Sequence, residues 1–301
     1  MCVFSRRKNP KKNSASAVAG PDLFEQSFWR LYRESLQLKD RCALMSAYKK
    51  RVQANELALQ QRPVNKGYIG MGYHNLAILN LYHISAGLEA AKQARQSLEC
   101  GDDFYKLSEK RRDILQFGAH LESLQVAAMT STSYDEAISY INEGKKLYGG
   151  VFADMLESLL DFRKTNPRYG AYQRAVSLTY YSRVSAELDK GNYAPALGLM
   201  EIMLTNAEAP EYDYSYEEYV DILDDYACVT VMLLLEKGRI LNGTNREFAE
   251  ELAWIADKPL KMLADFMPDC QPGDREKFEM VIDVYRNIYG IAERNSFKAF
   301  R

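Results

Sequence analysis

The chain has 301 residues, of which 47% are hydrophobic and 27% are charged. This balance is typical of a globular protein and excludes disorder over the whole length. The 39 basic and 41 acidic residues give a formal net charge of −2, so an affinity for nucleic acid is not expected. The longest unbroken apolar run, from Val231 to Leu235, is far shorter than the ~20 residues that cross a bilayer. No transmembrane segment is therefore expected.

Residues 1–21 form a basic tail with no acidic residue before Asp22. Its basic residues are Arg6, Arg7, Lys8, Lys11 and Lys12. Without these five, 34 basic residues stand against 41 acidic ones, so the rest of the chain carries −7. The tail lacks apolar periodicity, which predicts a disordered arm. An organelle transit peptide and a polybasic anchor for anionic lipid or nucleic acid are the alternatives, and Cys2 beside the bases could carry an acyl chain.

Cysteines and histidines show no spacing typical of a metal or catalytic site. They are Cys2, Cys42, Cys100, Cys228 and Cys270, with His74, His83 and His120. The cysteines form no CxxC pair, and the histidines form no HExxH motif. We therefore expect free thiols in a reducing, cytoplasmic compartment, with organelle targeting through the tail as the alternative. We expect no metal, no cofactor and no enzymatic activity.

Helix signals recur along the rest of the chain. Capping boxes begin at Ser133, Ser215 and Thr244, and Gly149-Gly150 and Asn242-Gly243 mark helix ends. Between these marks the apolar residues recur with helical period. The predicted helices are 22–38, 41–61, 68–84, 87–99, 103–129, 134–147, 151–164, 168–189, 193–206, 215–241, 245–256, 258–267 and 273–297. No segment alternates like a strand, so the chain is expected to be all-α, with one helical domain over 22–301 and a sub-boundary near 207–214.

A helix-pair pattern occurs three times. Its small, apolar and aromatic positions are Tyr134, Ala137, Ile141 and Gly144; Tyr193, Ala196, Met200 and Met203; and Tyr73, Leu76, Ala77, Leu88 and Ala91. Leu121, Leu124 and Ala128 are the predicted first-helix contacts of Tyr134. The alanines would let two helices approach closely, and overpacking would follow from a larger residue.

These residues resemble tetratricopeptide repeats over about residues 68–206. The second helices, aligned on Leu88, Tyr134 and Tyr193, are 46 and 59 residues apart, rather than the 34 of that family, so the resemblance is to a divergent member. It implies antiparallel helical hairpins stacked into an α-solenoid. The family's two-carboxylate clamp of Asn, Lys and Arg is not carried over, because Asn75 matches one position and no basic partners follow.

Lys66 to Gly72 has the glycine content of a phosphate-cradling loop, but a helix rather than a strand is predicted before it. A flexible helix start is therefore favoured over a nucleotide site. The basic run of Lys106, Lys110, Arg111 and Arg112 is interpreted as a solvated helix face.

From Gly191 to Glu236 the chain contains no Lys or Arg, whereas acidic and tyrosine residues alternate after position 207. One interpretation is a loop that leads into a helix N-terminus, where acids suit the dipole. The functional interpretation is a docking surface for a basic partner. The residues predicted to bind that partner are Tyr212, Asp213, Tyr216, Glu217 and Glu218.

Together these features favour a non-enzymatic adaptor or scaffold that binds a partner protein or peptide, of basic character, through a helical-repeat groove. The alternative is a regulatory or sensor module that binds a short peptide or small molecule. We expect no binding to nucleic acid and no transmembrane segment. Any contact with a membrane surface would be weak and would involve the basic tail.

Overall fold

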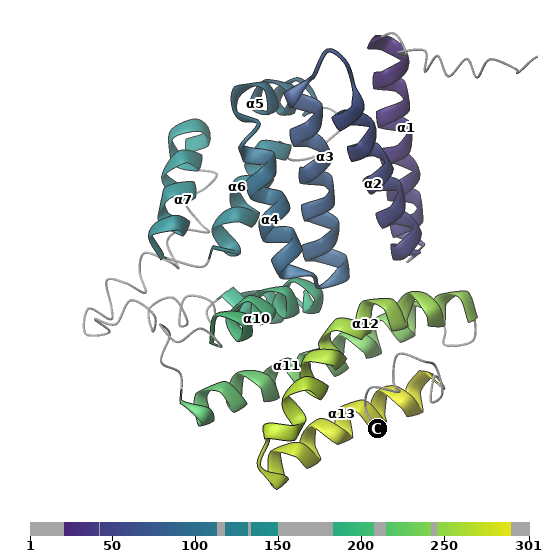
Figure 1. The fold of residues 1–301 in the computed structure, drawn as a ribbon, viewed down its shortest axis with the longest axis vertical. Helices are drawn as coiled ribbons and strands as arrows, with labels where there is room; N and C mark the ends of the chain where they lie inside the picture. The colour runs from purple at the N-terminus through teal and green to yellow at the C-terminus, as the bar shows by residue number, and fades with distance from the viewer. Residues whose placement is uncertain are drawn as a thin grey trace, which may run out of the picture.

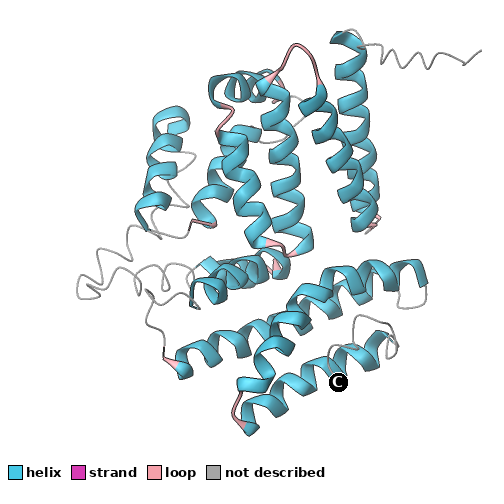
Figure 2. Cartoon of the chain, in the orientation of Figure 1, coloured by secondary structure: helices cyan, strands magenta, loops and turns pink. Residues whose placement is uncertain are grey.

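The computed structural model describes residues 21–41, 43–112, 118–131, 134–149, 183–207, 215–241 and 246–289, which form helices with short connections (Figure 2). Over these ranges no strand occurs, which confirms the predicted all-α fold. None of the helices described is long and apolar enough to span a bilayer. The basic tail as far as residue 20 and the predicted helix 151–164 lie outside the described residues.

The N-terminal helices mostly stand side by side, with the helix Gly101–Lys110 across their upper end (Figure 1). They are α1 (Pro21–Asp40), α2 (Leu44–Gln60), α3 (Lys66–Leu79), α4 (Gly87–Leu98), α5 (Gly101–Lys110), α6 (Ala119–Met129) and α7 (Tyr134–Tyr148). α1 packs on α2, α2 on α3, α3 on α4, and α6 on α7. α3 also contacts α5 and α6, so it lies at the centre of this group.

The C-terminal helices run across the lower end of the first group (Figure 1). They are α10 (Tyr193–Ala207), α11 (Tyr216–Leu241), α12 (Arg246–Phe266) and α13 (Pro272–Tyr289). Residues 183–189, before α10, are also helical. α10 contacts α4 on one side and α11 on the other, and α11 contacts both α12 and α13. α10 therefore joins the two groups.

A continuous apolar core passes through this junction. It includes Ala90 of α4, Leu199 of α10, and Tyr226 of α11, all buried. A second, aromatic cluster lies between α1 and α3, where the rings of Phe24 and Phe28 meet the Tyr68 ring edge-on at 5.0 and 5.1 Å. Full burial of such side chains contributes about 1.5–3 kcal/mol each, so these clusters are what hold amphipathic helices of modest length together.

The small residues predicted at helix contacts are buried. Ala137 of α7 is 4% exposed and Ala196 of α10 is 0% exposed. Leu121 and Leu124 of α6 form one cluster with Ile141 of α7. The side chain of Tyr134 lies outside the description.

One predicted helix is two helices in the structure. The prediction of an unbroken helix over 103–129 is wrong, because α5 ends at Lys110 and α6 starts at Ala119. The backbone of Gly118 is extended, with ψ 124°, and the Ser108 hydroxyl accepts a hydrogen bond from His120 N at 2.9 Å. The break lets α6 fold back against α5 and α3.

Two other predicted boundaries also differ. The helix predicted over 68–84 ends at Leu79, and a π turn over Asn80–Ile84 leads to Ser85, whose φ of 63° is left-handed. Conversely, the helices predicted over 245–256 and 258–267 form the single helix α12, with Pro259 inside it. Buried Ile255 and Leu260 flank Pro259, so tertiary packing holds this helix together despite the missing hydrogen bond.

Candidate functional site

The residues predicted to bind a partner lie at the start of α11. Tyr212 and Asp213 are outside the described residues. Tyr216, Glu217 and Glu218 occupy the first turn of α11. The structure therefore describes the surroundings of three of these five residues, and each of the three has a different environment.

Glu218 belongs to a capping box with Ser215. Ser215 N donates to Glu218 Oε2 at 3.0 Å, and Glu218 N donates to Ser215 Oγ at 3.1 Å. This reciprocal pair satisfies two backbone donors that the helix itself leaves open. The prediction of a capping box at Ser215 is confirmed, and Glu218 stabilises the helix start.

Tyr216 anchors α11 to α13. Its hydroxyl accepts a hydrogen bond from Gln271 N at 2.9 Å and donates to Asp274 Oδ2 at 3.2 Å. Its ring stacks on Phe266 at the end of α12, with 6.5 Å between centroids. Two tertiary hydrogen bonds and a stacked ring explain this tyrosine as a packing residue, a role that the sequence pattern did not reveal.

Glu217 is exposed. It is the first residue of an exposed side of α11 that carries polar side chains at one end and apolar side chains at the other. Four residues later comes Asp221, and the series continues with Asp225, Cys228, Met232 and Leu235, all of them exposed. Spacings of four and three residues place side chains on one side of a helix. Met232 is 44% and Leu235 is 47% exposed, which is unusual for neighbouring large apolar side chains.

α13 continues this surface. Its Met280 and Val284 are 58% and 36% exposed, and Lys277 lies one turn before Met280. Lys277 Nζ is 3.9 Å from Asp224 Oδ2 of α11, which shows that the two exposed edges are adjacent. We use the name outer face for Glu217, Asp221, Asp225, Cys228, Met232 and Leu235 of α11 with Lys277, Met280 and Val284 of α13.

Acidic groups are concentrated at one end of the outer face. Burial, and then the like charges of Asp224 and Asp221, raise the pKa of the Asp225 carboxyl. Burial, and then the charges of Asp224 and Asp225, raise the pKa of the Cys228 thiol, while Lys277 opposes this shift. The outer face therefore combines an acidic end with an apolar stretch, and one lysine lies at its edge.

A serine, a histidine and a carboxylate meet inside the N-terminal group. His74 Nδ1 lies 3.0 Å from Ser123 Oγ, and His74 Nε2 lies 3.3 Å from Glu122 Oε2. The same three groups, differently arranged, form hydrolase triads. Here, however, Ser123 is 0% exposed, and its hydroxyl is also 2.9 Å from the Ser97 hydroxyl. A substrate carbonyl has no access to it, so the cluster is a buried hydrogen-bond network between α3, α4 and α6.

His120 is a second buried histidine. Its Nδ1 lies 3.0 Å from the Tyr148 hydroxyl, between α6 and α7. Burial, and to a lesser degree the charge of His74, lower the pKa of His120 to about 4. The imidazole is therefore neutral at pH 7 and acts as a hydrogen-bonding core residue.

Glu201 of α10 is a buried carboxylate at the junction of the two helix groups. It is 0% exposed, and its Oε2 accepts from Gly87 N, the first residue of α4, at 2.8 Å. Its Oε1 pairs with Lys258 of α12. Burial raises the pKa of Glu201, whereas Lys258 and the α4 amides oppose the shift. A carboxylate at a helix N-terminus suits the helix dipole, so Glu201 ties α10 to α4 and α12.

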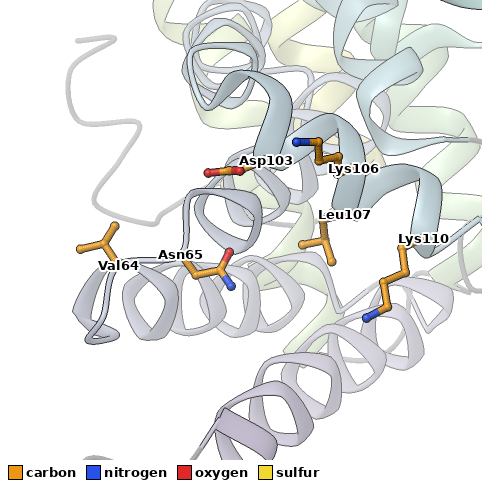
Figure 3. Close-up of a pocket in the computed structure, with 6 residues that line it drawn as sticks. All are labelled: Val64, Asn65, Asp103, Lys106, Leu107 and Lys110. Carbon is orange, nitrogen blue, oxygen red and sulfur yellow. The ribbon is translucent and has the colours of Figure 1, made fainter.

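A pocket of about 410 Å³ lies where α5 passes the start of α3 (Figure 3). It is lined by Val64, Asn65, Asp103, Lys106, Leu107 and Lys110. The Asn65 side chain already accepts from Tyr68 N, and Asp103 offsets the charge of the lysines. The pocket therefore lacks a buried, unpartnered group that would select an anion.

The glycines from Lys66 to Gly72 serve helix packing. They lie in the first turns of α3, which no strand precedes over residues 43–65. A Cβ on Gly67 would lie 2.8 Å from Asp103 O, and one on Gly70 would lie 2.6 Å from Phe104 Cγ. Only glycine allows α5 to approach α3 this closely, which accounts for the glycine content without a nucleotide.

Among the residues that the structure describes, no group of three or more His, Cys, Asp or Glu side chains is placed to hold a metal ion. Comparisons of the chain with family models, with curated proteins and with solved structures find no match.

Proposed function

We propose that this protein is a non-enzymatic adaptor, a divergent tetratricopeptide-like array of helical hairpins that binds a partner protein. The packing of α3 on α4 and of α6 on α7, with small residues at the contacts, supports the hairpin arrangement. Stacked hairpins offer extended surfaces for partners.

One observation carries the proposal, namely the exposure of Met232 and Leu235 on α11 and of Met280 and Val284 on α13, two helices that pack against each other. Large apolar side chains that gather on a surface, bordered by charge, mark interaction sites in soluble proteins. Glu217 stands at the acidic end of this surface. In this proposal Tyr216 and Glu218 act indirectly, because they hold the start of α11 in place.

A photo-crosslinking amino acid introduced at Met232 or Met280 in the full chain tests the proposal in cells. We expect both positions to give a covalent product with the same partner, because they lie on one surface. Leu59 of α2, which is 41% exposed, is the matched control position and should not give this product. An absence of products at both outer-face positions, or identical products at all three positions, would contradict the proposal.

A further inference from the structure

The outer face has the geometry that receives an α-helix. Asp221, Asp225, Cys228, Met232 and Leu235 follow one another at intervals of four, three, four and three residues. This alternation is the seam spacing of a coiled coil, where side chains of one helix fit between those of another. On α13 the exposed residues 277, 280 and 284 follow at three and four, so two seams lie next to each other.

Recognition here depends on side chains. Backbone donors and acceptors inside α11 and α13 are paired within the helices, so the face offers no edge to which an extended peptide could add as a strand. An amphipathic helix, by contrast, recognises a helical groove through apolar side chains at intervals of three and four residues. Met232, Leu235 and Met280 are placed to contact such side chains.

The charges select among the helices that would fit. Glu217, Asp221 and Asp225 lie at one end of the outer face, and α11 from Tyr216 to Glu236 contains no basic residue. Partial burial raises the pKa of Asp225, and crowding of its carboxylate with those of Asp224 and Asp221 raises that pKa further. A partner with Lys or Arg beside its apolar positions would neutralise this crowding.

Other occupants are disfavoured by the same charges. A membrane with anionic lipids and a nucleic acid would both meet carboxylates. A second copy of this chain would bring the carboxylates of α11 against one another, with Lys277 of α13 as the one base that the outer face contains. We infer that the outer face binds an amphipathic α-helix of a partner protein, with basic residues that flank its apolar stripe at the end that meets Asp221 and Asp225. This inference rests on the proposed function.

The test is a selection from a displayed library of random 20-residue segments against the full chain. Counter-selection uses a variant with Met232→Ser, Leu235→Ser and Met280→Ser, which alters only exposed side chains. The strongest segment is then synthesised, and its binding is measured by titration at several salt concentrations. Cys228 serves as a native reporter, because it is exposed on the outer face and its alkylation can be followed by peptide mass spectrometry.

We expect the selected segments to be helical when bound, to carry Lys or Arg, and to protect Cys228 from alkylation. The double variant Asp221→Asn/Asp225→Asn should weaken binding by roughly 3- to 30-fold at low salt, since exposed charge pairs are worth little individually, and it should reduce the salt dependence. The matched control, Glu56→Gln/Leu59→Ser on α2, changes one exposed acid and one exposed leucine and should bind like the wild type.

The other outcomes separate the inference from the proposed function. Selected segments that protect Cys228 but are extended, neutral or acidic, or that bind the amide variant equally well, overturn the inference and leave the adaptor proposal standing. Dimerisation of the full chain that Leu235→Ser abolishes overturns the inference in favour of a second copy. If no segment protects Cys228 and no crosslink forms at Met232 or Met280, both are wrong.

Discussion

Gly87 begins α4 directly against α10, and Gly87→Ala tests how the two helix groups are joined. A Cβ at this position would lie 2.6 Å from the carbonyl carbon of Gly198 and closer still to its oxygen. These are backbone atoms of a packed helix, so they cannot rotate aside as a flexible side chain would. We therefore expect the substitution to push α4 away from α10.

The expected loss of stability has two parts. Overpacking by an added methyl group in a tight contact costs about 1–3 kcal/mol. Displacement of α4 also breaks the hydrogen bond from Gly87 N to Glu201 Oε2, which is 2.8 Å long, and a hydrogen bond to a charged group contributes about 1.5–3 kcal/mol. Together these give a loss of about 2.5–6 kcal/mol, a large share of the 5–15 kcal/mol typical of a folded protein.

Urea denaturation followed by circular dichroism measures this loss as a lower midpoint at an unchanged slope. Gly273→Ala is the control, because a Cβ at Gly273 of α13 would meet nothing within 4 Å and should change stability by less than about 1 kcal/mol. If Gly87→Ala yields no soluble protein, Gly198→Ala gives a milder test, since its Cβ would meet Leu81 Cδ1 at 3.0 Å. A Gly87→Ala protein within about 0.5 kcal/mol of the wild type would refute the contact between α4 and α10.

Three further predictions concern stability. Because burial holds the pKa of Glu201 above its ordinary value, the stabilising contribution of its protonated form is present below pH ~4.3 and is lost as pH rises through the folded pKa. Glu201→Gln should therefore gain stability relative to the wild type as pH rises from ~4.3 through the folded pKa, and a difference that does not vary with pH would contradict this. Ala137→Leu should cost about 1–3 kcal/mol by overpacking between α6 and α7; an unchanged melting temperature would show that their contact is misplaced. Ser215→Ala should cost about 0.5–2 kcal/mol by removing the cap of α11, measured by urea denaturation, and a wild-type midpoint would show that the capping box contributes nothing.

The helices were predictable because their signals are local. The period of apolar residues and the cap formed by Ser215 with Glu218 involve residues a few positions apart, and both are present in the structure. The errors arose where a distant contact overrides a local signal. Pro259 predicts the end of a helix, yet α12 continues through this position because the side chains on either side of Pro259 are buried.

The candidate site was predictable only in part. The lack of basic residues from Gly191 to Glu236 points to α11, and Glu217 lies on the outer face. The sequence predicts Tyr216 as a contact residue for a partner, but its hydroxyl donates to Asp274 of α13, 58 positions further along. The sequence pattern does not single out Met232 and Leu235, because an apolar stripe on a helix ordinarily faces the core.

Local sequence signals are enough to predict that the described residues are helical, where most of these helices begin, and which small residues are buried, since periodicity and capping depend on near neighbours along the chain. The exposed side of α11 and the bond from Glu201 of α10 to Gly87, 114 positions away, come instead from the packing of distant helices. Burial and pairing depend on which helices meet in space. α11 has apolar residues on more than one side, and the packing of α10, α12 and α13 determines which of them remain at the surface.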